Sequence, residues 1–169
     1  MNFDAVYEEL ASGIDIIPAL LKGVTQAEAQ IRPSPESWSI LEVVCHLYDE
    51  EREDFREHLD LILHRPNDSW KLIDPEGWVT ARKYDERDLA EMLDNFLTER
   101  TRSLDWLQSL ADPNWEAVYT TPYRTMTAGD MLCSWAAHDN LHMRQLVELR
   151  RARIERITQP YNVAYAGDW

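Results

Sequence analysis

Two histidines spaced four residues apart form the most distinctive chemical pattern in the sequence. On a helix, His138 and His142 would lie one turn apart on the same face. Trp135 and Leu141, on or beside this face, indicate that it points toward the interior, where an imidazole without a partner is costly. Histidine pairs of this kind often bind a metal ion. The pair alone is a weak signal, because buried histidines also occur as core residues bonded to a neighbouring polar group.

A third histidine, His46, lies between Val43 and Leu47 in another segment of helical periodicity. If the two helices are antiparallel, His46 and His142 lie about 10 and 13 Å from the same end, at 1.5 Å per residue. Three histidines with an open fourth position form the ligand set of catalytic zinc sites, whereas structural zinc sites use four protein ligands. Taken alone, His46 is more readily explained as a core residue bonded to a neighbouring carboxylate, and this alternative stays open.

Glu50 is the carboxylate that spacing places beside this candidate site. It follows His46 by one helical turn, so it could be a fourth ligand or accept a hydrogen bond from a metal-bound imidazole. The alternative is a solvated residue in the acidic run 49–51. We therefore predict His46, His138 and His142 as metal ligands, with Glu50 as the candidate for a catalytic or supporting role.

The remaining histidines and the two cysteines are assigned to structure. We expect His58 and His64 to lie on the surface of a charged helix, without a functional role. Cys45 and Cys133 are interpreted as small core residues rather than ligands. No Ser–His–Asp or Cys–His arrangement in the sequence competes for the chemistry.

Four segments of helical periodicity must position these residues, and strand patterns are nearly absent. The segments are approximately residues 4–22, 39–64, 85–112 and 127–156. A capping box at Ser39 and Glu42 and a capping pattern at Thr127 mark the starts of the second and the fourth. The sequence therefore predicts one all-α domain over residues 1–169, folded as a four-helix bundle.

The long connection at 65–84 constrains the order of the helices. The second helix would be about 39 Å long at 1.5 Å per residue. About 20 extended residues can span up to about 66 Å, so the connection can return along the bundle and leave the second and third helices parallel. We therefore predict an up-down-down-up bundle with a long crossover between its second and third helices.

Aromatic residues in irregular segments are candidates for covering an open metal position. Trp70 and Trp78 lie in the 65–84 connection, and Tyr161 and Tyr165 lie in the C-terminal tail. Small-molecule pockets are mostly apolar, and long ordered connections are often functional. We expect the open position to face one of these segments. The alternative is that these aromatic residues only plug the ends of the bundle.

Two segments resemble the DinB/YfiT-like superfamily of metalloenzymes. Residues 38–47 read WSILEVVCHL and residues 138–146 read HDNLHMRQL, in the order and on the helices where that family carries its motifs. The resemblance implies an up-down-down-up bundle and a divalent metal held by His46, His138 and His142. Leu141 departs from the family pattern, because many members have a further histidine there. Family members with known activities are thiol-dependent transferases and isomerases that use bacillithiol, mycothiol or glutathione.

Composition excludes several classes of partner. The chain has 17 basic and 31 acidic residues, for a net charge of −14, which argues against binding nucleic acid or an anionic membrane. No apolar stretch approaches the ~20 residues of a transmembrane helix, and the start MNFDAVYEEL has no basic region of a signal peptide. We expect a cytoplasmic protein that acts on a small-molecule substrate, and a homodimer is one assembly that it could form.

The leading hypothesis is a divalent-metal-dependent enzyme with an open three-histidine site. Such a site could lower the pKa of a thiol or of water, so we expect a thiol-dependent transferase or a hydrolase that acts on a small electrophile. The metal could be Zn, Ni, Fe or Mn, and a low-molecular-weight thiol is the candidate cosubstrate. One alternative is a non-catalytic stress-response protein that binds a metal or ligand. The other is an interaction module whose histidines are structural.

Overall fold

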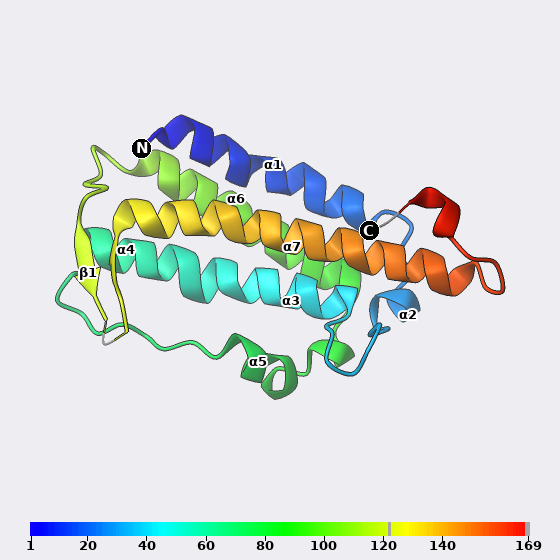
Figure 1. The fold of residues 1–169 in the computed structure, drawn as a ribbon. Coiled ribbons are helices and arrows are strands. Elements are labelled where there is room, and N and C mark those ends of the chain that lie inside the picture. Colours follow the sequence, from blue (N-terminus) through cyan, green and yellow to red (C-terminus); the bar gives the residue numbers. More distant parts are fainter. Residues whose placement is uncertain (122, 168–169) are drawn as a thin grey trace.

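Four long helical stretches run side by side through the described residues, 1–121 and 123–167, of this computed structural model (Figure 1). They are α1 (Phe3–Leu21), the continuous run of α3 (Ile40–Glu50), η1 (Glu51–Phe55) and α4 (Arg56–His64), then α6 (Leu89–Ser109) and α7 (Ala128–Ile157). Shorter elements are α2 (Gln26–Ala29), α5 (Pro75–Ala81), η2 (Tyr84–Glu86), β1 (Val118–Thr120), β2 (Thr125–Thr127) and η3 (Ala164–Ala166). The predicted all-α four-helix bundle is confirmed.

The directions of the helices agree with the predicted topology. In Figure 1, α1 and α7 run one way along the bundle, whereas α3, α4 and α6 run the other way. The connection after α4 passes back along the bundle through α5 and η2 before α6 begins. This return places the start of α6 beside the start of α3, which is the up-down-down-up order.

Two of the predicted helix starts are confirmed, and a third lies elsewhere. The Ser39 hydroxyl accepts a hydrogen bond from the Glu42 amide (3.2 Å), and the Glu42 carboxylate accepts one from the Ser39 amide (2.7 Å). Thr127 caps α7 in the same reciprocal way. The third long helix begins at Leu89, four residues after the predicted start at residue 85, because Asp88 supplies its cap while Asp85 belongs to η2.

A short β-hairpin interrupts the otherwise helical chain, and the periodicity did not predict it. Strands β1 and β2 pair antiparallel with Val118 opposite Thr127, and they join α6 to α7 at one end of the bundle (Figure 1). Each strand has only three residues, so the alternation of side chains is too short to stand out in the sequence. The hairpin forms one wall of the larger pocket described below.

The interior consists of two apolar clusters with polar residues between them. One cluster includes Ile17, Leu47 and Leu146, and the other includes Leu10 and Trp135. Between the two clusters, the long helices carry buried polar or charged side chains, and α1 carries a glycine. They are Gly13, His46, Glu50, Glu51, Glu99, Arg100, Ser103, Asp139 and His142. The bundle therefore contains a polar layer, and the candidate ligands belong to it.

Arg100 is the central side chain of this layer and is 1% exposed. Its guanidinium donates two hydrogen bonds to Glu51, at 2.9 and 2.8 Å, and two more to Asp139. It also donates to the carbonyl of Leu10, so one side chain connects α6 with η1, α7 and α1. Trp135 donates its indole N–H to Glu51 at 3.0 Å. The buried charges are thus paired and hydrogen-bonded, as burial requires.

The run from α3 to α4 contains a π-helical turn, η1, directly after the histidine-bearing segment. This turn places Glu51 toward the interior, beside Arg100. Single π-helical turns are rare and occur frequently at functional sites. Within the described residues, no helix is both long and apolar enough to span a membrane.

Candidate metal centre

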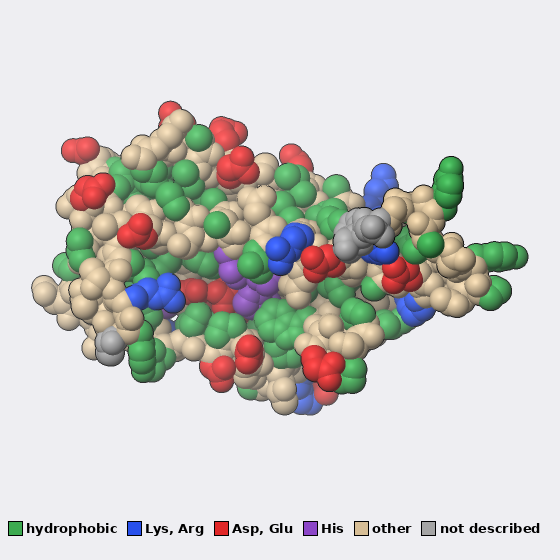
Figure 2. All heavy atoms as spheres, viewed as in Figure 1, with side chains coloured by type: hydrophobic (Ala, Val, Ile, Leu, Met, Phe, Trp, Pro, Cys, Tyr) green, Lys and Arg blue, Asp and Glu red, His purple; other side chains and the backbone are tan. Residues whose placement is uncertain are grey.

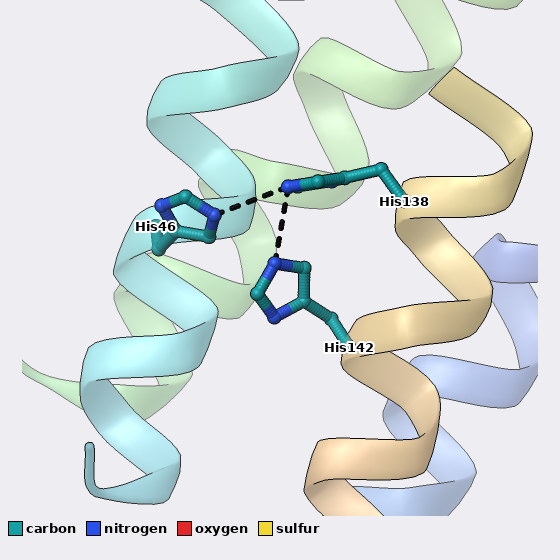
Figure 3. A group of neighbouring side chains, drawn as sticks. All are labelled: His46, His138 and His142. Carbon is teal, nitrogen blue, oxygen red and sulfur yellow. Dashed lines mark hydrogen bonds between the residues drawn. The ribbon is translucent and has the colours of Figure 1, made fainter. Parts of the chain in front are cut away.

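The side chains of His46, His138 and His142 converge between α3 and α7 (Figure 3). The Nε2 atom of His138 lies 3.3 Å from Nε2 of His46 and 3.1 Å from Nε2 of His142. His46 and His142 are buried and His138 is partly exposed. The prediction that these three residues meet is confirmed. Within the described residues they form a group of potential metal ligands whose donor atoms all lie within 4.8 Å of one another.

Gln145 determines which nitrogen of His142 is free. The Nδ1 atom of His142 lies 2.8 Å from Oε1 of Gln145, and an amide oxygen can only accept a hydrogen bond. Nδ1 therefore carries the proton, and Nε2 directs its lone pair toward the other two histidines. Metal-bound histidines are commonly oriented by such a second hydrogen bond, so this contact fits a ligand role.

His46 and Glu50 lie one turn apart, with two buried polar atoms facing each other. Nδ1 of His46 and Oε1 of Glu50 have no hydrogen-bond partner among the described residues and lie 3.8 Å apart. Burial, with the hydrogen bond and negative charge of Asp54, raises the pKa of Glu50 to about 9. Burial thus disfavours the charged form of Glu50, and its Oε1 atom faces Nδ1 of His46 at a separation too long for a hydrogen bond.

Burial also keeps the three histidines neutral. It lowers the pKa of His46 to about 2 and that of His138 to about 3, and the neighbouring histidines lower both further. The pKa of His142 is lowered by burial as well. Neutral imidazole is the form that binds a metal ion.

Two of the three nitrogen separations match the requirement of a divalent ion. Two ligands at 2.0–2.1 Å from a tetrahedral zinc ion are about 3.3 Å apart. The observed separations, 3.3 Å for the His46–His138 pair and 3.1 Å for the His138–His142 pair, agree with this value. The residues present therefore fit a three-histidine site for a divalent metal.

Aromatic rings form the immediate surroundings of the triad. The Trp38 ring lies 4.8 Å from the His46 ring and stacks parallel to the His142 ring at 6.5 Å, measured between centroids. The Phe55 ring lies 4.9 Å from the His138 ring. These contacts fix the orientation of the imidazoles and keep water from part of the site. Trp135 lies in the interior, 1% exposed.

Two pockets reach the triad from either side of Leu141. The larger, of 1090 Å³, has His138, Phe55, Trp70 and Asp54 among its lining residues. The smaller, of 840 Å³, is lined by His142, Trp38, Gln145, Arg144, Glu148 and others. Leu141 lines both pockets. Figure 2 shows histidine atoms at the surface near the middle of this face, with acidic and apolar side chains beside them.

Some of the aromatic residues expected to cover the site line the larger pocket, and others do not. Trp70, from the 65–74 part of the crossover, lines this pocket, as does Tyr119 of the β-hairpin. Trp78 lines neither pocket and instead stacks under the Arg82 guanidinium at 4.0 Å. The tail residues Tyr161 and Tyr165 are 77% and 106% exposed and line neither pocket. Of the two segments expected to face the site, the crossover contributes Trp70 to the pocket lining, whereas Tyr161 and Tyr165 of the tail do not contribute.

The solvent exposure of His58 and of Cys133 differs from the prediction. His58, expected on the surface, is 0% exposed because Trp70 and the crossover cover it. Cys133, expected in the core, is exposed. His64 is on the surface and Cys45 is in the core, as predicted. The sequence signal for His58 was its position four residues after Asp54, which places both on one face of the helix.

Comparisons with known proteins agree with this fold. The structure of YfiT from Bacillus subtilis, described as a probable metal-dependent hydrolase with an unusual four-helix bundle topology, superposes with a TM-score of 0.78. The two chains are 18% identical, and the match covers 88% of this chain and 86% of YfiT. At this identity the likeness shows the fold. Comparison with curated proteins gives no significant match. The family model of the DinB superfamily matches residues 9–146, and the chain therefore belongs to the DinB superfamily.

Proposed function

We propose that the protein is a divalent-metal-dependent enzyme that acts on a small electrophile in the larger pocket. The observation that supports this proposal most directly is the convergence of three neutral imidazole Nε2 atoms beside that pocket. The similar fold of YfiT, which is described as a probable metal-dependent hydrolase, adds support. Zn, Ni, Fe and Mn are the candidate metals, because imidazole ligands suit all of them.

When bound, a divalent ion would polarise a carbonyl group or lower the pKa of a neighbouring water or thiol. The residues of the chain have separate tasks around it. Gln145 holds His142 in the tautomer that presents Nε2, and Glu50 faces the other nitrogen of His46. Phe55 and Trp38 press against the imidazoles and limit access to the two pockets. Trp70 and Tyr119 provide apolar walls for the body of a substrate.

A hydrolase and a thiol-dependent transferase differ in whether a second reactant needs a binding site. Two pockets meet at Leu141 and reach different histidines. Both pockets carry charged groups: Arg144 and Glu148 line the smaller, and Asp54, Arg124 and Asp130 line the larger, beside aromatic side chains such as Phe55 and Trp70. Two pockets that reach different histidines would suit a transferase that holds a thiol in one pocket and an electrophile in the other. The hydrolase remains the simpler candidate.

The first experiment measures metal content and then activity. Elemental analysis of the purified protein should find about one divalent ion per chain for a three-histidine site. The His142→Ala variant should lose this ion, whereas His64→Ala, which changes an exposed histidine, should keep it. Circular dichroism should show an intact bundle for His142→Ala, because caps and apolar clusters hold the helices without the ion. Retention of the metal by His142→Ala would contradict the assignment.

The second experiment screens the metal-loaded protein with esters, amides and alkyl halides, each with and without thiols. A hydrolase turns over substrates without a thiol, and a transferase requires one. Trp70→Ala should raise KM, whereas Trp78→Ala, outside both pockets, should leave kcat and KM unchanged. A protein that binds the metal but no ligand at it would be a storage or sensor protein instead.

A further inference from the structure

Arg124 is the one arginine or lysine among the described residues that line the larger pocket. The turn of the β-hairpin fixes its backbone, because its carbonyl accepts a hydrogen bond from the Thr121 amide (2.8 Å) and its amide donates one to the Thr121 hydroxyl (3.0 Å). Its side chain is exposed and makes no hydrogen bond or ion pair within the described part of the chain. The N–H donors of the guanidinium are thus free for a ligand.

An arginine without an acidic partner stands out in this chain. Acidic residues outnumber basic ones by 31 to 17, and most arginines form ion pairs with them. Two acids also line the pocket of Arg124, but each is bonded elsewhere. Asp54 is bonded to Nδ1 of His58, and Asp130 accepts a hydrogen bond from the Thr127 amide at 2.8 Å. Arg124 is therefore the charge in this pocket that the described residues leave unpaired.

The pocket combines this charge with aromatic walls and one histidine of the triad. The Trp70 and Tyr119 rings lie 5.4 Å apart, and the Tyr119 hydroxyl donates a hydrogen bond to the carbonyl oxygen of Asp68 at 2.7 Å. This bond ties the hairpin to the crossover and holds both rings in the pocket wall. His138 lines the same pocket. Binding sites for small molecules commonly join apolar surface to a few polar groups that fix the orientation of the ligand.

Resting on the proposed function, we infer that the electrophile bound in the larger pocket carries a carboxylate and that Arg124 is the residue that selects for it. A guanidinium binds a carboxylate through two parallel N–H···O hydrogen bonds. A single negative charge is the better match, because Asp54 and Asp130 line the same pocket and would repel a second one. The carboxylate anchors one end of the substrate at the hairpin, so that its body contacts the aromatic walls and its reactive group faces the triad.

The competing explanation is that Arg124 is an ordinary solvated residue at the end of the hairpin. Arg156 is a matched control, because it is also exposed, lies in the last turn of α7 and lines neither pocket. It too forms no ion pair within residues 1–121 and 123–167. A solvated Arg124 predicts that charged and uncharged ligands bind alike, whereas a selecting residue makes the affinity depend on the charge of the ligand.

The test uses the full chain loaded with Zn²⁺ and two series of alkyl hydroxamates of graded length, because a hydroxamate binds an accessible zinc ion. One series ends in a carboxylate and the other in the uncharged carboxamide, and isothermal titration measures their affinities. In the wild type, the carboxylate should bind about tenfold more tightly than the carboxamide at the length that spans the pocket. In Arg124→Gln this ratio should fall to about one, with the carboxamide unaffected.

Two further variants separate recognition from a general effect of charge. Arg156→Gln should keep the full preference for the carboxylate. Arg124→Lys should keep part of it, because an ammonium retains the charge but not the two parallel hydrogen bonds. Equal affinities of the two series for the wild type at every length would overturn the inference. A preference that persists in Arg124→Gln would also overturn it, because another group would then hold the carboxylate.

A second measurement is independent of the metal and so separates this inference from the proposed function. In NMR spectra of the metal-free chain, the Nε–H signal of Arg124, identified by its loss in Arg124→Gln, should shift on titration with benzoate and stay in place with benzamide. An unmoved signal would overturn the inference whatever the outcome with zinc. Failure to take up zinc, or of both hydroxamate series to bind, would contradict the proposed function, and the substrate inferred from it would fall even if benzoate moved the signal.

Discussion

Gly13 leaves the space that the guanidinium of Arg100 occupies, because a Cβ at Gly13 would lie 2.9 Å from Nη1 of Arg100. The same Cβ would lie 3.2 Å from a carboxylate oxygen of Asp139. Arg100 is buried and fixed by hydrogen bonds to Glu51, Asp139 and the Leu10 carbonyl, so it has little freedom to move aside. The absence of a side chain on α1 thus permits the buried ion cluster of the polar layer.

Gly13→Ala should therefore destabilise the fold, although alanine is the better helix former. The gain in helix propensity is about 1 kcal/mol, and overpacking against fixed groups costs about 1–3 kcal/mol. We expect a net loss of about 1 kcal/mol in the free energy of unfolding, measured with urea. Ser12→Ala, at the neighbouring position, should change it by less than about 0.5 kcal/mol. A more stable Gly13→Ala protein would show that Arg100 can move.

Arg100→Met should be far more damaging than the same change at Arg102. Without Arg100, the carboxylates of Glu51 and Asp139 lose their buried cation, and such a loss costs about 3–5 kcal/mol. The Arg102 side chain is 66% exposed. Its partner Glu99 keeps a second cation, Arg56, so loss of the Arg102 pair should cost at most about 1 kcal/mol. Urea unfolding of both variants measures the difference. Equal losses would mean that the buried cluster contributes no more than a surface pair.

Gln145→Leu should weaken metal binding without removing a ligand. The leucine cannot accept the hydrogen bond from Nδ1 of His142, so the imidazole loses the contact that fixes its tautomer. Loss of such supporting contacts typically lowers metal affinity about 10- to 100-fold. Competition with a chromophoric zinc chelator measures the affinity. Asn140→Leu, the same type of change at an exposed position on α7, should leave the affinity unchanged.

Glu42 should make stability depend on pH in the acid range. Burial opposes its charge, but hydrogen bonds from Arg32 and the Ser39 amide outweigh this and hold the pKa of Glu42 below its usual value of 4.5. Because the unfolded chain binds the proton more readily, the stabilisation is present above pH 4.5 and is lost as the pH falls through the folded-state pKa.

Unfolding measured between pH 3 and 7 tests this dependence. The difference in stability between the wild type and Glu42→Gln should be greatest near neutral pH and should shrink as the solution becomes acidic. A difference that is independent of pH would mean that Glu42 contributes only through the geometry of its capping box. Glu36→Gln, an exposed change in the preceding loop, serves as the control.

The sequence was sufficient to predict the features that depend on local patterns. Capping residues such as Ser39 and Thr127 mark helix starts through contacts within four residues, and periodicity shows which face is buried. The 65–84 connection is long enough to return along the bundle, so its length alone allowed parallel second and third helices to be predicted. The histidine triad could be predicted because His138 and His142 share a helix face, whereas their approach to His46 also required the antiparallel packing of two helices.

Other features depend on contacts between distant segments, which one sequence does not reveal. Arg100 reads as a surface residue of a charged helix, and only the presence of Glu51, Asp139 and the space at Gly13 explains its burial. His58 was misassigned for the same reason, since its cover comes from Trp70 in a connection without regular structure. Cys133 lies between Leu132 and Trp135 in the sequence, but those two residues are buried whereas Cys133 lies on the exposed face of α7.

The π-helical turn at Glu51–Phe55 sets the rotation of α4 about the helix axis relative to α3. An α-helix advances by about 100° per residue, so deletion of one residue from this turn would rotate His58 by about that angle relative to His46. The ligand-bearing half and the pocket-lining half of one helix are therefore coupled by a single extra residue. An insertion or deletion in this turn would change which side chains after it face the pocket, while His46, His138 and His142 stay in place.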